Sequence, residues 1–126
     1  MVSARAKGNA TERRAQLELE EEGWITQRAP PASKFSKQTD LFGLFDILAL
    51  KLTWSTLGAN DYFKNYKTQE RKWIQAKTNS LPTKEWKEKA KEFKEKYCCC
   101  FDSVEIWTYW QRGRRKKKQG WEKIIL

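Results

Sequence analysis

Two parts of the chain have the hydrophobic pattern of helices. Residues 7–22 contain no proline, are rich in Ala, Leu and Glu, carry a thin apolar stripe, and precede Gly23, a residue type that frequently ends helices. Residues 86–97 place apolar side chains three or four positions apart with Lys and Glu between them, and Thr83 can cap their N-terminus. We therefore predict two helices, with a core face on the second formed by Trp86, Ala90, Phe93 and Tyr97.

Five shorter stretches have the composition of strands, with apolar, β-branched and aromatic residues between turn signals. Pro30 and Pro31 end the first, and a basic turn separates the last two, which we predict to form a hairpin. Turn signals at residues 58–61 lie between aromatic-rich arms, so we expect residues 52–71 to be an extended hairpin or an excursion between two central strands. The predicted strands are residues 24–28, 41–52, 72–78, 104–111 and 121–126.

These elements predict an α/β fold in the order α-β-β-β-α-β-β, a mixed central sheet flanked by helices. The length of 126 residues fits one domain covering residues 1–126. The sequence has no signal-peptide stretch and no long apolar span, so we expect a cytoplasmic protein with no membrane partner.

Charged residues interrupt the apolar runs of two predicted strands. Asp46 lies in the run from residue 45 to 50, and Lys77 lies in the run from 73 to 78. A buried carboxylate or ammonium is costly unless it is paired or binds a metal. Strand alternation puts Gln75 and Lys77 on one face, and Asp46 can converge with them if the two strands are neighbours. The alternative is an Asp–Lys ion pair on a partly exposed sheet.

The choice of metal follows from the available ligands. The chain has no His, and a carboxylate such as Asp46 suits magnesium, which keeps several of its waters. Glu12, on the first predicted helix, can add a ligand directly or through water, and the Lys77 ammonium can position a water or stabilise developing charge. Adjacent cysteines form poor disulfides and an incomplete zinc site, so we expect small, reduced residues at a helix end for Cys98, Cys99 and Cys100.

The net charge of +10 and the pI near 9.6 are typical of a protein that binds polyanions, nucleic acid before an anionic membrane surface. The densest basic run is predicted to be a hairpin tip that contacts phosphates, or else a solvated turn. Aromatic and basic residues in segment 52–71 suit stacking on unpaired bases, a dimer interface or a satellite core. We expect Trp86, Phe93 and Tyr97 in the core rather than as base-stacking platforms. The basic run includes Arg114, Arg115, Lys116, Lys117 and Lys118.

Three groups of residues, in this order, resemble the PD-(D/E)XK nuclease superfamily, and within it the archaeal and phage Holliday junction resolvases. The resemblance covers residues 7–78. The second group is Phe45-Asp46-Ile47-Leu48-Ala49, similar to the Asp-containing strand of the family, and the third is Trp73-Ile74-Gln75-Ala76-Lys77, similar to its Glu-x-Lys strand. The first group consists of Lys7-Gly8, Glu12-Arg13, Leu19, Glu22-Gly23-Trp24 and Arg28.

The resemblance implies a restriction-endonuclease-like fold and a homodimeric endonuclease that uses Mg²⁺ or Mn²⁺ to hydrolyse branched DNA in recombination and repair, in a prokaryote or a virus. Asp46 then matches the principal metal ligand, Lys77 the catalytic lysine, and Glu12 the helix carboxylate that completes the site. Arg13 would support that carboxylate or contact phosphate, with Lys7 and Arg28 as further DNA contacts.

Gln75 departs from the family pattern, which usually has an acid at this position. Its amide oxygen can ligate a metal but adds no negative charge. The enzyme can be active with Gln75 as a neutral ligand, another acid such as Glu70 can enter the site, or the chain can bind DNA without cutting it. We favour activity, because Glu12, Asp46 and Lys77 all remain. The alternatives are a non-cleaving DNA-binding member and a small basic RNA-binding protein.

Overall fold

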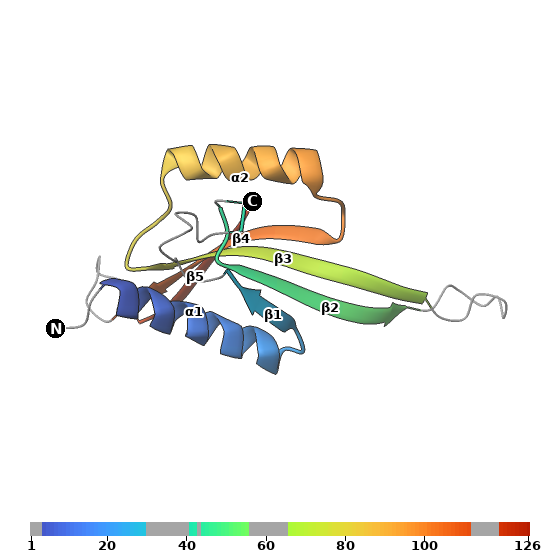
Figure 1. Ribbon diagram of the computed structural model, residues 1–126, viewed down its shortest axis with the longest axis horizontal. Coiled ribbons are helices and arrows are strands. Elements are labelled where there is room, and N and C mark those ends of the chain that lie inside the picture. Colours follow the sequence, from blue (N-terminus) through green and yellow to red (C-terminus); the bar gives the residue numbers. More distant parts are fainter. Residues whose placement is uncertain (1–3, 30–40, 43, 56–65, 112–118) are drawn as a thin grey trace, which may run out of the picture.

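A computed structural model of the chain describes residues 4–29, 41–42, 44–55, 66–111 and 119–126. In these residues two helices, α1 (Ala4–Glu21) and α2 (Lys84–Tyr97), lie on opposite faces of one sheet (Figure 1). The prediction of a mixed α/β fold with a mixed sheet and two helices is confirmed. The strands are β1 (Ile25–Arg28), β2 (Ile47–Ser55), β3 (Tyr66–Thr78), β4 (Asp102–Trp110) and β5 (Gly120–Ile125).

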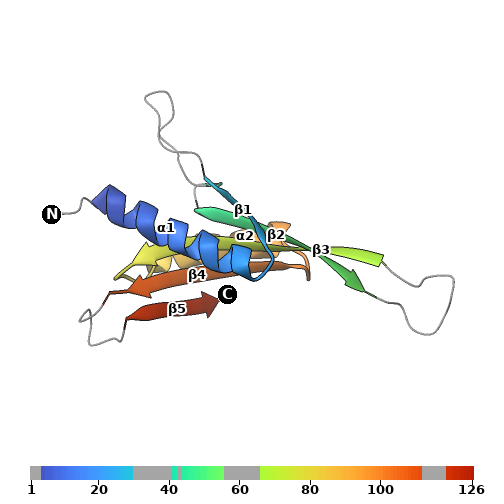
Figure 2. The same cartoon turned by 90° about the horizontal axis from the view of Figure 1, so that it is seen from below.

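The five strands lie side by side in their chain order, β1-β2-β3-β4-β5. Neighbouring strands are antiparallel except β3 and β4, which run parallel. A parallel pair needs a long crossover connection, and α2 forms it on the face opposite α1. Seen from below, β2 and β3 extend beyond the other strands toward the ends that flank residues 56–65 (Figure 2).

Packing between α1 and the sheet forms one hydrophobic cluster. Ala15 and Leu19, one turn apart on α1, are fully buried in it. Burying a leucine side chain contributes about 1.5–3 kcal/mol, so even a thin apolar stripe holds this helix on the sheet. Their partners are Trp24, Ile47, Ala49, Ile74 and Trp107.

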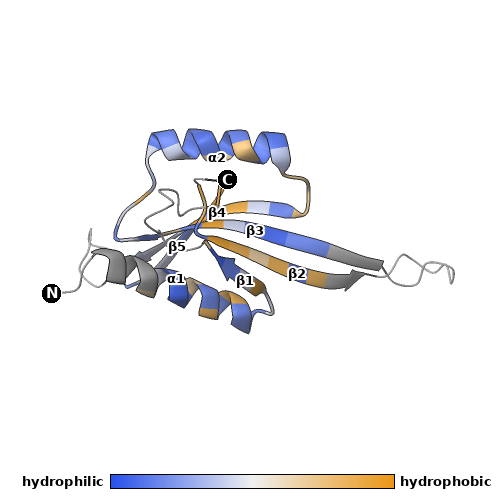
Figure 3. Ribbon diagram, viewed as in Figure 1, coloured by the Kyte–Doolittle hydropathy of each residue, from blue (hydrophilic) through white to orange (hydrophobic). Residues whose placement is uncertain are grey.

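A second cluster lies under α2. Ala90 and Phe93 of the helix are buried there against Phe45 and Val104. Most of the helix is hydrophilic, in keeping with its exposed outer surface (Figure 3). The prediction that Tyr97 belongs to the core is wrong: it is 73% exposed, because it lies in the last turn of α2, at the edge of the apolar cluster, where its ring meets that of Phe93.

The N-terminus of α2 follows the prediction. The Thr83 hydroxyl accepts a hydrogen bond from the Trp86 backbone N–H at 3.1 Å, which satisfies a donor that the helix leaves unpaired. The Trp86 indole N–H donates to the Leu44 carbonyl at 2.9 Å. This bond ties the helix to the segment that leads into β2.

β2 begins later than the apolar run predicts. The apolar run at residues 41–52 is predicted to hold a central strand, and that strand begins only at Ile47, after an isolated bridge between Leu41 and Phe45. The Leu41 carbonyl accepts from the N–H groups of both Leu44 and Phe45, at 3.0 Å each. Asp46 therefore lies immediately before β2 rather than inside a strand.

The predicted excursion at residues 52–71 consists in part of the paired ends of β2 and β3. Pairing continues from Leu52 opposite Gln69 to Ser55 opposite Tyr66. The turn signals at residues 58–61 and the basic run at 112–118, including Arg114 to Lys118, lie outside the described residues. The strands on either side of the basic run, β4 and β5, pair antiparallel as predicted.

Residues of β4 are buried on both faces of the sheet, because a helix covers each face (Figure 1). Glu105 on the α1 side is buried with its charge satisfied. It accepts hydrogen bonds from the Trp107 indole at 2.9 Å and the Ser103 hydroxyl at 2.8 Å, and its carboxylate lies 3.4 Å from the Lys72 ammonium.

Neither helix, over the residues described, is long and apolar enough to cross a membrane.

Candidate functional site

The backbone of β3 fixes the carboxylate of Asp46. The Asp46 N–H donates to the Ile74 carbonyl at 2.9 Å, one residue out of step with the register that pairs Ile47 with Ile74. One residue further, its side-chain Oδ2 accepts from the Ala76 N–H at 2.9 Å, so the carboxylate takes the position of a ladder partner. With only 8% of the residue exposed, Asp46 is a buried carboxylate held in one orientation at the junction of β2 and β3.

Gln75 supplies a second oxygen at this junction. The register that pairs Ile47 with Ile74 places Asp46 beside Gln75 on the next strand, as predicted for neighbouring strands. Gln75 Oε1 is buried and has no hydrogen-bond partner in the described part of the chain. An unsatisfied buried acceptor costs about 1–3 kcal/mol, so this amide oxygen is a group that a ligand would satisfy.

Lys77 brings a cation to the same face of β3. Residues 75 and 77 point the same way along a strand, and their partners on β4 are Ile106 and Thr108. The Lys77 side chain is half-buried, and within the described residues no carboxylate forms an ion pair with it. The described residues therefore do not form the Asp46–Lys77 ion pair that was the alternative interpretation.

α1 brings Glu12 to this end of the sheet. The buried Thr11 hydroxyl is hydrogen-bonded to the Thr78 hydroxyl at the end of β3. The next residue, Glu12, accepts a hydrogen bond at 3.0 Å from Arg28 Nε and a second one from Arg28 Nη2. Arg28 is paired in register with Ile47, and the following Ala29 N–H donates to the Asp46 carbonyl at 2.8 Å. Glu12 and Asp46 therefore lie at one corner of the fold, with Glu12 held by Arg28 on the α1 side. Gln75 and Lys77 point to the opposite, α2 side of the sheet, because they alternate along β3 with Ile74, which packs under α1.

Two carboxylates and one amide oxygen are the oxygen donors that this corner offers. Among the described residues, no three Cys, Asp or Glu side chains gather closely enough to hold a metal ion. Glu70 cannot replace the missing acid, because it lies five residues from Gln75 on the opposite face of β3, about 16 Å away by strand rise. A metal here would depend on the Gln75 amide and on water to complete its ligands.

The remaining predicted contacts lie elsewhere or outside the described residues. Arg13 is exposed on α1, next to Glu12. The Lys7 side chain and the basic run are among the parts that the structure does not describe. Cys98 ends α2 as its C-terminal cap, and all three cysteines are free as expected, with Cys99 and Cys100 exposed.

A second buried carboxylate, Asp102, lies on the α2 side of the sheet and was not singled out from the sequence. Its Oδ1 accepts from Arg71 Nε at 2.6 Å and from the Trp73 indole at 3.1 Å, and its Oδ2 accepts from Arg71 Nη2 at 3.0 Å and the Cys99 N–H at 2.9 Å. Burial raises the pKa of Asp102, but the hydrogen bonds from Arg71, Cys99 and Trp73 outweigh it and hold the pKa well below its usual range. The hydrogen bond to Asp102 also raises the pKa of Arg71.

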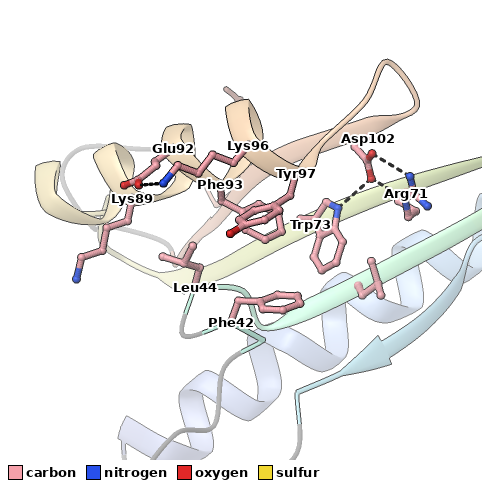
Figure 4. Close-up of a pocket in the computed structure, with 11 residues that line it drawn as sticks. Phe42, Leu44, Arg71, Trp73, Lys89, Glu92, Phe93, Lys96, Tyr97 and Asp102 are labelled. Carbon is pink, nitrogen blue, oxygen red and sulfur yellow. Dashed lines mark hydrogen bonds and ion pairs between the residues drawn. The ribbon is translucent and has the colours of Figure 1, made fainter.

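This cluster lines a groove of about 760 Å³ between α2 and the sheet (Figure 4). Its members are far apart in the sequence, with Arg71 and Asp102 separated by 31 positions, and each alone resembles an ordinary polar residue in a strand. Only the parallel pairing of β3 with β4 places Arg71 opposite Asp102. The sequence signal available was weak: a Trp and an Asp at strand positions that face a helix.

No protein-family model, curated protein or solved structure matches this chain.

Proposed function

We propose that the protein is a divalent-metal-dependent endonuclease of the PD-(D/E)XK type that cuts branched DNA, with its active site at the corner of Asp46, Gln75, Lys77 and Glu12. The observation that carries the proposal is the pairing of a fixed, buried carboxylate with a buried amide oxygen that lacks a partner. Asp46 is anchored by the Ala76 N–H, and Gln75 Oε1 lies beside it unsatisfied. Oxygen ligands of this kind suit Mg²⁺ or Mn²⁺.

The arrangement of elements supports the restriction-endonuclease-like fold. A helix is followed by three antiparallel strands, and the second helix then leads to a strand parallel to β3. The candidate residues lie where the start of β2 meets the end of β3. The basic charge of +10 suits a DNA substrate, because phosphate contacts dominate DNA affinity.

Each residue of the corner has a distinct role in this proposal. Asp46 and Gln75 would hold the metal, and Glu12, which lies on the α1 side of the corner, would reach it around the end of the sheet, directly or through water. The bound cation would lower the pKa of a coordinated water and neutralise a phosphate oxygen. Lys77 would orient the attacking water or stabilise the charge that develops on the phosphate. Arg28 holds Glu12 in place, since it donates two hydrogen bonds to the carboxylate.

Gln75 itself favours a second candidate, a DNA-binding protein of the same fold that does not cut. An amide in place of a carboxylate leaves a metal with weaker electrostatic attraction. Such a protein would keep its phosphate contacts and lose only the metal-dependent step.

A cleavage assay separates the two candidates. The wild-type protein is incubated with an end-labelled four-way junction and with a linear duplex of the same sequence, in Mg²⁺, in Mn²⁺ and in EDTA. We expect divalent-dependent cuts in the junction and slower or no cutting of the duplex. Binding without cutting in either metal would favour the second candidate, and equal cutting of both substrates would reject the preference for branched DNA.

A further inference from the structure

Aromatic and basic side chains line the groove between α2 and the sheet. Aromatic rings from three separate segments meet there: Phe42 lies 5.8 Å from Trp73 and 5.4 Å from Phe93, and Phe93 lies 5.4 Å from Tyr97, between ring centroids. Its volume of about 760 Å³ is in the range of small-ligand pockets. Figure 4 shows these rings around the groove, with Lys89 and Lys96 on the helix above and Arg71 on the strand at one side.

Two of the rings are held at the surface, although burying them would be favourable. Phe42 is 70% exposed and Tyr97 is 73% exposed. Phe42 also has a φ of 54°, a left-handed conformation that costs a non-glycine residue about 1–3 kcal/mol. Exposed aromatic faces beside a groove offer stacking surfaces, and a base stacked on such a ring contributes about 1–3 kcal/mol.

Hydrogen bonds already saturate the polar groups deep in the groove. Asp102 accepts four of them, and one of these comes from the Trp73 indole N–H. A base in the groove would therefore meet ring faces rather than free donors and acceptors. Stacking without readout of base edges tolerates any base.

Cations at the rim suit the phosphates that flank a stacked base. Lys89 and Lys96 each pair with a glutamate one turn away on α2, at 3.2 Å and 2.6 Å. These pairs are exposed, and exposed pairs contribute at most about 1 kcal/mol, so phosphates can compete for the ammonium groups. The helix sequence contains six Lys and four Glu, and the whole chain carries +10. A neutral apolar peptide would gain nothing from this charge.

The groove and the candidate active site lie on one face of β3. Trp73 and Lys77 are four residues apart and point the same way, about 13 Å apart by strand rise. That separation corresponds to roughly four base-pair steps of DNA. A single DNA strand can therefore place a phosphate at Asp46 and an unpaired base in the groove.

We propose that this groove binds an unpaired nucleobase of the DNA substrate, stacked on Phe42 and Tyr97, with the flanking phosphates on Lys89 and Lys96. The inference rests on the proposed function, since it takes DNA as the substrate. It gives the protein a means to prefer branched or frayed DNA over intact duplex, because only the former offers an unstacked base without the cost of extruding one.

Binding to matched DNAs without divalent metal tests the groove separately from catalysis. The probes are a blunt duplex and the same duplex with a short single-stranded thymidine overhang, in EDTA. We expect Tyr97→Ala and Phe42→Ala to weaken binding to the overhang DNA by about tenfold, and binding to the blunt duplex by less than about twofold. Tyr97→Phe should keep wild-type affinity, because stacking needs the ring and not the hydroxyl. Ile125→Ala, which removes an exposed apolar side chain outside the groove, is the matched control.

A photo-crosslink locates the base directly. The overhang carries 5-iododeoxyuridine, and mass spectrometry of the irradiated complex identifies the linked peptide, which we expect to contain Phe42 or Tyr97. Crosslinks elsewhere, equal losses on both DNAs, or no preference of the wild type for the overhang would overturn the inference. So would a change in oligomeric mass of Tyr97→Ala without DNA, which would make the groove an interface between copies.

The two proposals fail in distinguishable ways. Metal-dependent cutting of the junction, with groove variants that bind both DNAs like wild type, would reject the groove and keep the nuclease. Ring-dependent binding of the overhang without any cutting would keep the groove and reject the nuclease. A wild-type protein that binds neither DNA would reject both.

Discussion

Asp46 and Asp102 are two carboxylates beside the same strand, β3, and their surroundings differ in one respect. Asp102 accepts four hydrogen bonds, two of them from the guanidinium of Arg71, and its side chain is 2% exposed. Asp46 is anchored at its Oδ2 by the Ala76 backbone N–H, and next to it the Gln75 amide oxygen has no hydrogen-bond partner among the described residues.

That difference separates a stabilising cluster from a site that can take a ligand. A buried polar group that is fully hydrogen-bonded rigidifies a fold, whereas an unsatisfied one retains the cost of its lost hydration. The Arg71–Asp102 cluster fixes the parallel pairing of β3 with β4 and needs no ligand. The Asp46–Gln75 corner gains free energy when a cation or a donor occupies it.

Replacement of Lys77 should give the largest effect on activity without affecting the fold. Lys77→Met keeps the apolar stem and removes the ammonium, so we expect DNA cleavage to slow by roughly a hundred- to a thousandfold. Thermal unfolding should stay within a few degrees of wild type, because no described carboxylate pairs with Lys77. Lys91→Met, on the exposed side of α2, is the control. An equal loss in both variants would mean that general positive charge, and not Lys77, matters.

The opposite pattern is expected at Asp102. Asp102→Asn removes the charge that faces Arg71, and we expect a loss of about 2–3 kcal/mol in the free energy of unfolding, measured with urea. The value lies at the lower end for buried pairs because the Arg71 side chain is 34% exposed. Cleavage below the melting temperature should change little. A variant as stable as wild type would show that the cluster contributes nothing to the fold.

The lowered pKa of Asp102 leads us to expect that the stability of the fold depends on pH. Because the pKa of Asp102 is lowered in the folded protein, the unfolded chain binds more protons as the pH falls below about 4, the ordinary pKa of Asp. The stabilisation is present above that pH and is lost below it. Between about pH 5 and about pH 3, the free energy of unfolding measured with urea should therefore fall more steeply for wild type than for Asp102→Asn. Parallel curves would contradict the lowered pKa.

A smaller effect is expected from restoring the missing acid. Gln75→Glu places an anionic oxygen where the neutral amide now lies, so the magnesium concentration for half-maximal cleavage should fall by roughly tenfold. Without metal, the same change should destabilise the fold, because two carboxylates would then adjoin each other. Unchanged metal dependence would mean that Gln75 does not face the metal.

Local patterns predicted much of the fold. The α2 cap at Thr83, the strand at residues 24–28 and the antiparallel pairing of the last two strands all follow from short-range signals. The start of β2 did not, because the apolar run from residue 41 satisfies both a turn and a strand, and hydrogen bonds to the Leu41 carbonyl decide for the turn. The exposure of Tyr97 depends on where α2 ends above the sheet, and the helical spacing of apolar residues does not predict that position.

The candidate site was predictable to the extent that alternation and strand adjacency place residues. Asp46, Gln75 and Lys77 were expected near one another, and the register brings them to one end of β3. The anchoring of Asp46 by the Ala76 N–H and the pairing of Glu12 with Arg28 depend on tertiary contacts across 30 and 16 positions. The groove required the same kind of information, since its rings come from three elements.

A comparison of the cleavage rates of the Asp46→Asn and Asp102→Asn variants tests the contrast between the two carboxylates most directly. Both variants remove one buried negative charge beside β3 and keep an oxygen acceptor. With a four-way junction in Mg²⁺, at a temperature where both variants are folded, we predict a loss of roughly a thousandfold for Asp46→Asn with DNA affinity retained, and a rate within a few-fold of wild type for Asp102→Asn. Wild-type cleavage by Asp46→Asn would contradict the assignment of the active site.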